Sequence, residues 1–178
     1  AEPCGPGGNP VACENSKPGD PASEWDIVYT GQSSVQGFAT TMSVTPGGTV
    51  RFKIKASAAY TVDIYRLGYY GGMGARRQAP RWSVTNPVNQ PQCATDPSTQ
   101  NYDCGTWSVS TQWAVPAAAV SGVYIAKLTS GGDSGEIPFV VRDDSRTSDV
   151  LFKTSDATWH AYNPYGGANF YTAPSSLT

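Results

Sequence analysis

Charge is scarce in this sequence of 178 residues: Lys, Arg, Asp and Glu together make up 15% of it, and the formal net charge is −2. A nucleic-acid-binding domain needs a basic surface that neutralises phosphates, so this composition argues against that class. Histidine is scarcer still, with one residue, His160. A metal site with two histidine ligands from this chain is therefore excluded, and with it the usual zinc enzymes.

The sequence also lacks a run of about 18 apolar residues, the length that a membrane-spanning helix needs. It contains no Cys-x-x-Cys motif and no Gly-x-x-x-x-Gly-Lys-[Ser/Thr] phosphate loop. Turn-forming residues are abundant instead, with 19 glycines and 14 prolines, and so are aromatic residues, with 10 tyrosines and 5 tryptophans. This composition is typical of short strands joined by many turns, and at about 150 residues per domain the length fits one domain plus part of another.

The four cysteines are Cys4, Cys13, Cys93 and Cys104. Three pairings are open to four cysteines. We favour the local disulfides Cys4–Cys13 and Cys93–Cys104, because each pair lies in a turn-rich stretch with little core of its own. Disulfides indicate an oxidising compartment, so we expect a secreted, extracellular chain. The start at Ala1, without methionine, fits removal of a signal peptide.

Alternation of apolar and polar residues predicts β-strands in much of the chain. Between residues 50 and 55 it places Val50, Phe52 and Ile54 on one face and three cations on the other. Residues 120–128 resemble the tyrosine-corner strand of immunoglobulin-like sandwiches, with Tyr124 facing inward. Other strand-like runs cover residues 25–29, 35–44, 60–67, 107–115 and 136–141. Together these runs predict a mainly β fold, an immunoglobulin/fibronectin-like antiparallel β-sandwich followed by the start of an α/β unit.

Three parts are predicted along the chain. Residues 1–23, rich in Gly, Pro, Asn and Ser, form an extended N-terminal segment pinned by a disulfide. Residues 24–142 form the sandwich. Residues 143–178 contain a charged linker and the apolar run Val150–Phe152, which we expect to be the first strand of a truncated α/β catalytic-core-like region.

Two stretches of the sequence are distinctive. One is Tyr65-Arg66-Leu67-Gly68-Tyr69-Tyr70-Gly71-Gly72-Met73-Gly74, and the other is Ala161-Tyr162-Asn163-Pro164-Tyr165-Gly166-Gly167. With shorter stretches around residues 36–39, 121–128 and 137–144, they make residues 35–173 resemble the N,N-dimethylformamidase large-subunit-like family, in its secreted actinobacterial form.

The resemblance implies a β-sandwich ahead of an α/β core. In the formamidase, that core holds an iron ion bound by two Tyr and one Glu, which hydrolyses an amide. Tyr162 is the one position here that matches a family iron ligand. The resemblance therefore implies that this chain alone is inactive, that iron is bound only in the complete protein, and that the partner is the remainder of the polypeptide or a companion chain. A small amide is the implied substrate.

The glycine-rich loop 68–74 is a candidate binding or domain-interface site, together with Arg66, Tyr69, Tyr70, Arg76 and Arg77. Tyrosines beside cations can hold an anionic ligand or a sugar ring. Glycines also allow close packing, so that the aromatic rings can fill an interface with the next domain. We favour the interface interpretation.

His160 and Asp156 form the candidate catalytic pair of this chain. A spacing of four residues places both on one side of a helical turn, where the carboxylate could orient the imidazole as a general base. A structural or interface role for His160 is the stronger interpretation. The acidic residues Asp143, Asp144 and Asp149 could bind Ca²⁺ through carboxylate oxygens, but they lack EF-hand spacing. We interpret them as a solvated linker or as partners of Arg142 and Arg146.

A stand-alone extracellular module that binds a polysaccharide or a protein is the alternative function. Its basis is the surplus of aromatic residues on a sandwich. If Trp82, Trp107 and Trp113 formed a flat exposed strip, carbohydrate binding would be favoured; if they are buried, they serve the core.

Overall fold

A computed structural model describes residues 2–27, 34–99 and 101–171 of the chain. It divides into two compact units, which are described separately. The first contains residues 1–90 and 107–145, and the second contains residues 91–106 and 146–178. The predicted domain boundaries after residues 23 and 142 stay predictions. Among the described residues, no helix has the length and apolar character needed to cross a membrane.

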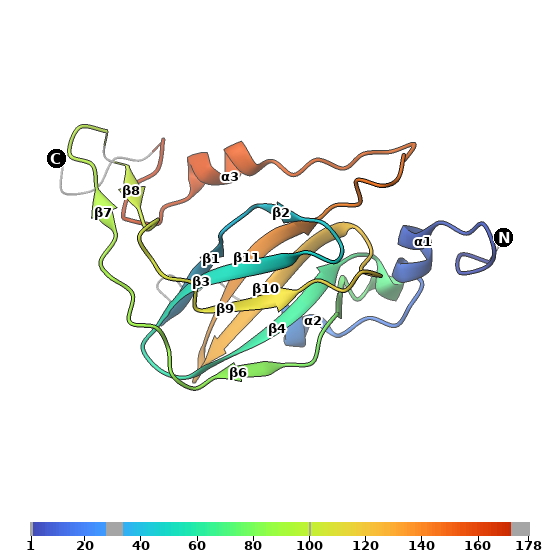
Figure 1. Cartoon of the computed structure of the whole chain (residues 1–178), viewed down its shortest axis with the longest axis horizontal. Coiled ribbons are helices and arrows are strands. Elements are labelled where there is room, and N and C mark those ends of the chain that lie inside the picture. Colours follow the sequence, from blue (N-terminus) through green and yellow to red (C-terminus); the bar gives the residue numbers. More distant parts are fainter. Residues whose placement is uncertain (1, 28–33, 100, 172–178) are drawn as a thin grey trace. The chain divides into compact units, whose positions relative to one another are not determined.

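The first unit is built from two β-sheets (Figure 1), which confirms the predicted mainly β, antiparallel fold. The larger sheet has the strand order β2-β11-β10-β4-β5, and β6 also pairs with β4. The smaller sheet has the order β1-β3-β9. Neighbouring strands are antiparallel except for β2 and β11. The strands are β1 (Val35–Ala39), β2 (Ser43–Val44), β3 (Thr49–Ala56), β4 (Tyr60–Leu67), β5 (Ala75–Arg77), β6 (Trp82–Val84), β9 (Thr111–Ala114), β10 (Gly122–Ser130) and β11 (Asp133–Val141).

The core of this unit is formed by the inward faces of both sheets, as the alternation predicts. In β3, Val50, Phe52 and Ile54 have no exposed surface. In β10 the inward residues Tyr124 and Leu128 are equally buried. The complete buried cluster consists of Val35, Val50, Phe52, Ile54, Tyr60, Val62, Ile64, Trp113, Val115, Tyr124, Ala126, Leu128, Ile137, Phe139 and Val141. Because apolar burial dominates the folding free energy, this shared core holds the two sheets together.

Tyr124 makes the hydrogen bond that defines a tyrosine corner. Its hydroxyl donates to the backbone carbonyl of Val120, at 2.7 Å. Burial raises the pKa of the Tyr124 phenol, the charges of Tyr70 and Glu14 act in the same direction, and the charge of Arg66 lowers it. The phenol therefore stays neutral and keeps its proton for this bond.

Replacing Tyr124 by phenylalanine should lower the free energy of unfolding by about 1–2 kcal/mol, because it leaves the Val120 carbonyl without this donor. Urea denaturation monitored by tryptophan fluorescence measures the change. Tyr69→Phe is the matched control, because the Tyr69 side chain is exposed, and it should be neutral. Equal stability of all three proteins would contradict the tyrosine-corner role.

The N-terminal segment was expected to be extended, but it contains helix α1 (Pro10–Asn15). Asn9 caps the helix by accepting from the backbone amides of Val11 and Ala12, and Pro10 occupies the first turn, where its missing N–H costs nothing. The run 25–29 was expected to be a strand. Trp25 instead ends helix α2 (Ala22–Trp25), and residues 28 and 29 lie outside the described residues.

The second unit joins two segments that are distant in the sequence. One segment contains the hairpin of β7 (Ala94–Thr95) and β8 (Tyr102–Asp103). The ring centroid of Tyr102 in this hairpin lies 5.7 Å from the ring centroid of Tyr165 in the other segment. Helix α3 (Asp156–Tyr162) belongs to the same unit. Val150–Phe152 is not a strand, and these three side chains are 78–88% exposed. The reason is that a strand needs a hydrogen-bonded neighbour, and no described segment pairs with these residues.

Candidate functional site

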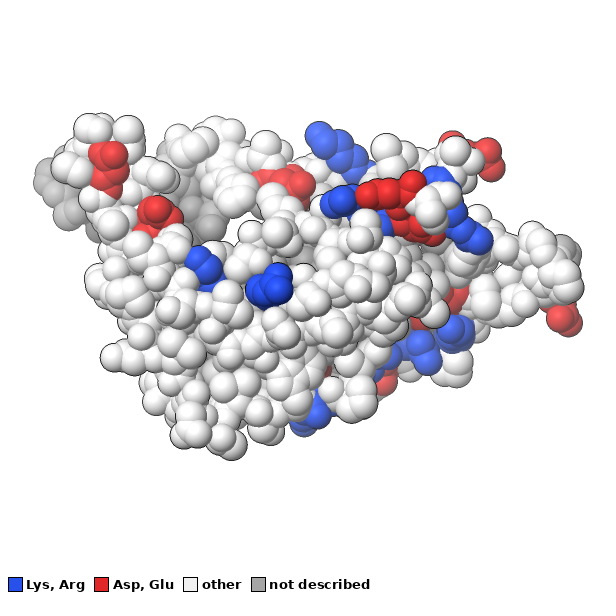
Figure 2. Space-filling model, viewed as in Figure 1, with Lys and Arg blue, Asp and Glu red and all other residues white. Residues whose placement is uncertain are grey.

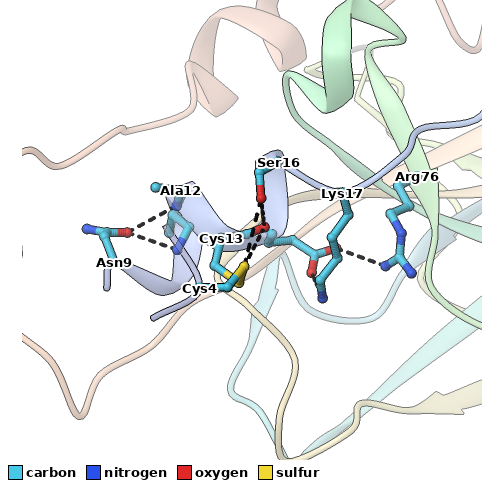
Figure 3. The surroundings of a disulfide bond; sticks show 9 residues. Cys4, Asn9, Ala12, Cys13, Ser16, Lys17 and Arg76 are labelled. Carbon is cyan, nitrogen blue, oxygen red and sulfur yellow. Dashed lines mark hydrogen bonds and ion pairs between the residues drawn. A yellow bond between two sulfur atoms is a disulfide. The ribbon is translucent and has the colours of Figure 1, made fainter. Parts of the chain in front are cut away.

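Both predicted disulfides are present, Cys4–Cys13 and Cys93–Cys104. The first joins the chain before α1 to the helix itself (Figure 3). A helix of six residues is marginal in water, so the covalent link and the Asn9 cap are what hold it. The hydroxyl of Ser16 closes the C-terminal end by donating to the Cys13 carbonyl at 2.8 Å.

Helix α1 brings one carboxylate, that of Glu14, into a buried position on the sandwich. Its side chain is 4% exposed. The ammonium of Lys17 donates to Oε2 at 2.6 Å, and Arg76 Nη1 donates to Oε1 at 3.1 Å (Figure 3). Gln78 Nε2 and the Tyr70 hydroxyl also donate to Oε1, at 3.1 and 3.2 Å. Four donors therefore converge on one carboxylate.

The surroundings of Glu14 favour its charged form. Burial by itself raises the pKa of this carboxyl, but the hydrogen bonds from Lys17 and Gln78 and the charges of Lys17 and Arg76 outweigh burial and lower the pKa to about 2. The pKa of the Tyr70 phenol shifts in the opposite direction, because burial raises it. At neutral pH a carboxylate thus faces a neutral phenol and two cations.

Arg66 supports this cluster from within the fold and is 2% exposed. It donates to the Tyr70 hydroxyl at 2.9 Å and to Asn15 Oδ1 at 3.0 Å. Its Nε and Nη2 atoms also donate to the Ser121 carbonyl, at 3.2 and 2.8 Å. These bonds use the guanidinium internally, so Arg66 positions Tyr70 and α1.

The glycine-rich loop is locked in a conformation that most residues avoid. Tyr70 has a φ of 43° and is 1% exposed, and Gly71, Gly72 and Gly74 also have positive φ. Gly74 has a second constraint, because a Cβ there would lie 2.6 Å from the Trp25 ring. Trp25 Nε1 in turn donates to the Met73 carbonyl at 3.0 Å. Strained backbone of this kind persists only where the surroundings hold it.

The tip of this locked loop is exposed. The Tyr69 side chain is 70% exposed and that of Met73 is 48% exposed. The five residues predicted as a binding or interface site thus separate into different positions. Arg66, Tyr70 and Arg76 gather around Glu14, and Tyr69 points to solvent.

Arg77 belongs to a different group, centred on Asp63 in β4. Asp63 is fully buried and accepts from Arg81 Nε through both oxygens, at 3.0 and 2.8 Å. Arg77 Nη1 lies 3.4 Å from Asp63 Oδ1, and Arg77 Nη2 donates to the Tyr65 hydroxyl at 2.7 Å and to Glu24 Oε2 at 3.3 Å. In Figure 2, some acidic and basic side chains on the face shown lie beside one another, and others stand apart from any opposite charge.

A cavity of about 150 Å³ opens beside the Glu14 cluster. Glu14, Lys17, Arg76 and Gln78 line one part of it, and Trp113, Pro116 and residues 118–120 line the rest. Lys17 and Arg76 are 43% and 34% exposed, so both cations are reachable from solvent. Glu14 and Gln78 were not predicted from the sequence. The Asn9-Pro10 pair could have indicated the helix, but no sequence signal marks Glu14 as buried.

The candidate catalytic and metal residues lie in the second unit. Asp156 and His160 are both in α3, His160 is exposed, and the structure gives no hydrogen bond or ion pair between these two described side chains. Tyr162 is 59% exposed and stacks on Tyr171, with ring centroids 4.5 Å apart. Within the described ranges, no three His, Cys, Asp or Glu side chains are grouped so as to hold a metal ion. The described residues do not complete an iron site around Tyr162, so the iron stays a prediction for the complete protein.

The tryptophans of the sandwich do not form an exposed strip. Trp107 and Trp113 are 3% and 8% exposed, and Trp82 is half-buried with its indole N–H donating to Thr111 Oγ1. The flat exposed strip of Trp82, Trp107 and Trp113 that would favour carbohydrate binding is therefore not present. The linker carboxylate of Asp144 pairs with Arg142 at 3.0 Å on the surface, as a solvated linker would.

Comparison with known families shows where the chain belongs. A family described as N,N-dimethylformamidase beta subunit-like, C-terminal, matches residues 61–178, which is 118 of the 178 positions. The chain belongs to this family. No curated protein matches it. The family region of this dimethylformamidase-like chain begins in β4 and includes loop 68–74, Arg76 and Gln78, whereas α1 lies before it. A large subunit of secreted actinobacterial type stays a prediction.

Proposed function

We propose that this chain is the β-sandwich part of a secreted dimethylformamidase-like amidohydrolase and packs on its α/β core. The core is supplied by the remainder of the polypeptide or by a companion chain. The complete protein hydrolyses an amide C–N bond, adding water to give a carboxylic acid and an amine. The sandwich itself supplies an interface and no catalytic group.

Loop 68–74 is the observation that carries this proposal. It lies in the family-matched region and presents Tyr69 and Met73 to solvent from a fixed backbone. A preorganised loop loses little conformational entropy on association, and exposed tyrosine is typical of binding hot spots. The description of the family as β-subunit-like supports an assembly with another subunit.

The second unit and the disulfides support the remaining parts of the proposal. Val150, Leu151 and Phe152 are exposed apolar residues that a neighbouring strand of an α/β core would cover. The two disulfides support secretion, since such bonds persist in oxidising compartments.

Substituting the loop tip should weaken assembly without unfolding the sandwich. Tyr69→Ser and Met73→Ser should each reduce association with the α/β core by roughly ten-fold, which is the effect of losing one hot-spot side chain. Association is measured by titrating the tagged chain with the α/β core, and amide hydrolysis by the assembled protein is measured in parallel.

Met42→Ser is the matched control. Met42 is 49% exposed, close to the 48% of Met73, but it lies between β1 and β2 and outside the family-matched region. It should assemble normally. Normal assembly of both loop variants, with unchanged thermal stability, would refute loop 68–74 as the interface.

A further inference from the structure

Helix α1 attaches to the sandwich in an unusual way. Its one buried residue is the charged Glu14, and the apolar Val11 is 37% exposed. Across the described residues 2–27, no other residue is buried. Apolar burial therefore contributes little to the docking of α1, and the carboxylate contacts are its main attachment.

The groups that receive this carboxylate belong to the sandwich. Tyr70 lies within the glycine-rich loop 68–74, Arg76 lies in β5 directly after it, and Gln78 follows β5. Each of the three donates to Glu14 Oε1, and all three lie in the family-matched region that excludes Glu14. Arg66 fixes the Tyr70 hydroxyl, and the Gln78 amide also donates to the Arg76 carbonyl at 3.2 Å. The Tyr70 hydroxyl and the Gln78 amide are thus held by sandwich contacts that do not involve the carboxylate.

We propose that Tyr70, Arg76 and Gln78 form a carboxylate-binding site of the sandwich, which the N-terminal arm fills with Glu14 as an internal ligand. The carboxylate of a small molecule binds there when the Glu14 side chain is withdrawn. The adjoining cavity of about 150 Å³ provides the access, and its apolar lining at Trp113 and residues 118–120 accepts a short apolar substituent. Arg76 makes one of its possible hydrogen bonds to Glu14, so further N–H groups remain for the second oxygen of a ligand.

Chemical rescue of Glu14→Ala tests this site. Acetate has the shape of the removed side-chain terminus, so roughly 0.1 M acetate at pH 7 should raise the Tm of Glu14→Ala by about 2–4 °C relative to chloride of equal ionic strength. Acetamide, the neutral molecule of the same size, should have no effect. Wild-type protein, in which Glu14 fills the site, should not respond to acetate.

Glu24→Ala is the matched control, because Glu24 also pairs with an arginine, at 3.3 Å, but its side chain is 47% exposed and makes no enclosed cluster. It should show no rescue. The double variant Glu14→Ala/Arg76→Gln lacks one of the three donors and should lose the acetate response of Glu14→Ala.

Should Glu14→Ala be unfolded in chloride, the same titration is followed by near-ultraviolet circular dichroism, where acetate should restore the folded signal and acetamide should not. Equal responses to acetate and acetamide would overturn the proposal. So would an equal acetate response of wild-type, Glu24→Ala and Glu14→Ala proteins. None of these measurements depends on the α/β core, so their failure is distinct from failure of the proposed function.

Discussion

Replacing Asp63 by alanine should lower the free energy of unfolding by about 3 kcal/mol, because it removes one partner of a buried ion pair. Asp63 has no exposed surface, and two cations, Arg77 and Arg81, depend on it. The side chains of Arg77 and Arg81 are 32% and 52% exposed, so water can solvate both guanidinium groups after the substitution. The expected loss of stability is therefore at the lower end of the range for broken buried ion pairs. Urea denaturation at pH 7 measures the change.

Asp144→Ala is the control for this prediction. Its carboxylate also pairs with an arginine, Arg142 at 3.0 Å, but the two side chains are 58% and 50% exposed. A surface pair of this kind contributes about 0–1 kcal/mol, so this substitution should be nearly neutral. If the two aspartate substitutions had equal effects, burial would not be the cause.

The strands with strict alternation could be predicted from the sequence because one rule decides them. Val50, Phe52 and Ile54 are spaced by two, and a strand with one buried face must place them together. The pairing of β10 with β11 fits the same pattern, and Ser130 pairs with Asp133 across the turn at Gly131-Gly132. In these places local pattern and tertiary packing require the same structure.

The Glu14 cluster could not be predicted, because its partners lie far apart in the sequence. Glu14 and Gln78 are separated by 64 positions, and nothing around Glu14 distinguishes it from a solvated glutamate. Asp63 presents the same difficulty within a predicted strand, where a charged residue normally faces solvent. Only the docking of α1 on the sandwich and the pairing of β5 with β4 bring Glu14 and Asp63 to Arg76 and Arg77.

The sequence predicts the glycine-rich loop and its neighbouring arginines as one binding or interface site. The structure assigns its residues to opposite environments: Tyr70 is 1% exposed and holds α1, whereas its neighbour Tyr69 is 70% exposed. Tyr70 itself has a positive φ of 43°, as do Gly71, Gly72 and Gly74 after it. One backbone conformation therefore serves both the internal carboxylate site and the proposed interface.

Acidification should destabilise this protein through Glu14. The folded-state pKa of about 2 lies below the ordinary value of 4.5, so the folded form binds the proton more weakly than the unfolded form. The resulting stabilisation, about 3 kcal/mol, is fully present above pH 4.5 and is lost as the pH falls towards 2. Free energies of unfolding from urea titrations between pH 6 and pH 2 measure this loss.

Glu14→Gln isolates this contribution, because it keeps the side-chain size and removes the titration. Hydrogen bonds lower the pKa values of Asp96 and Asp133, and burial raises the pKa of Glu136. These three groups titrate in both proteins, so their contributions to the pH dependence of stability cancel in the comparison. The stability difference between wild type and variant should therefore narrow by about 3 kcal/mol between pH 6 and pH 2. A difference that stays constant over this range would mean that the Glu14 carboxylate gains nothing from Lys17 and Arg76, and that other contacts hold α1 on the sandwich.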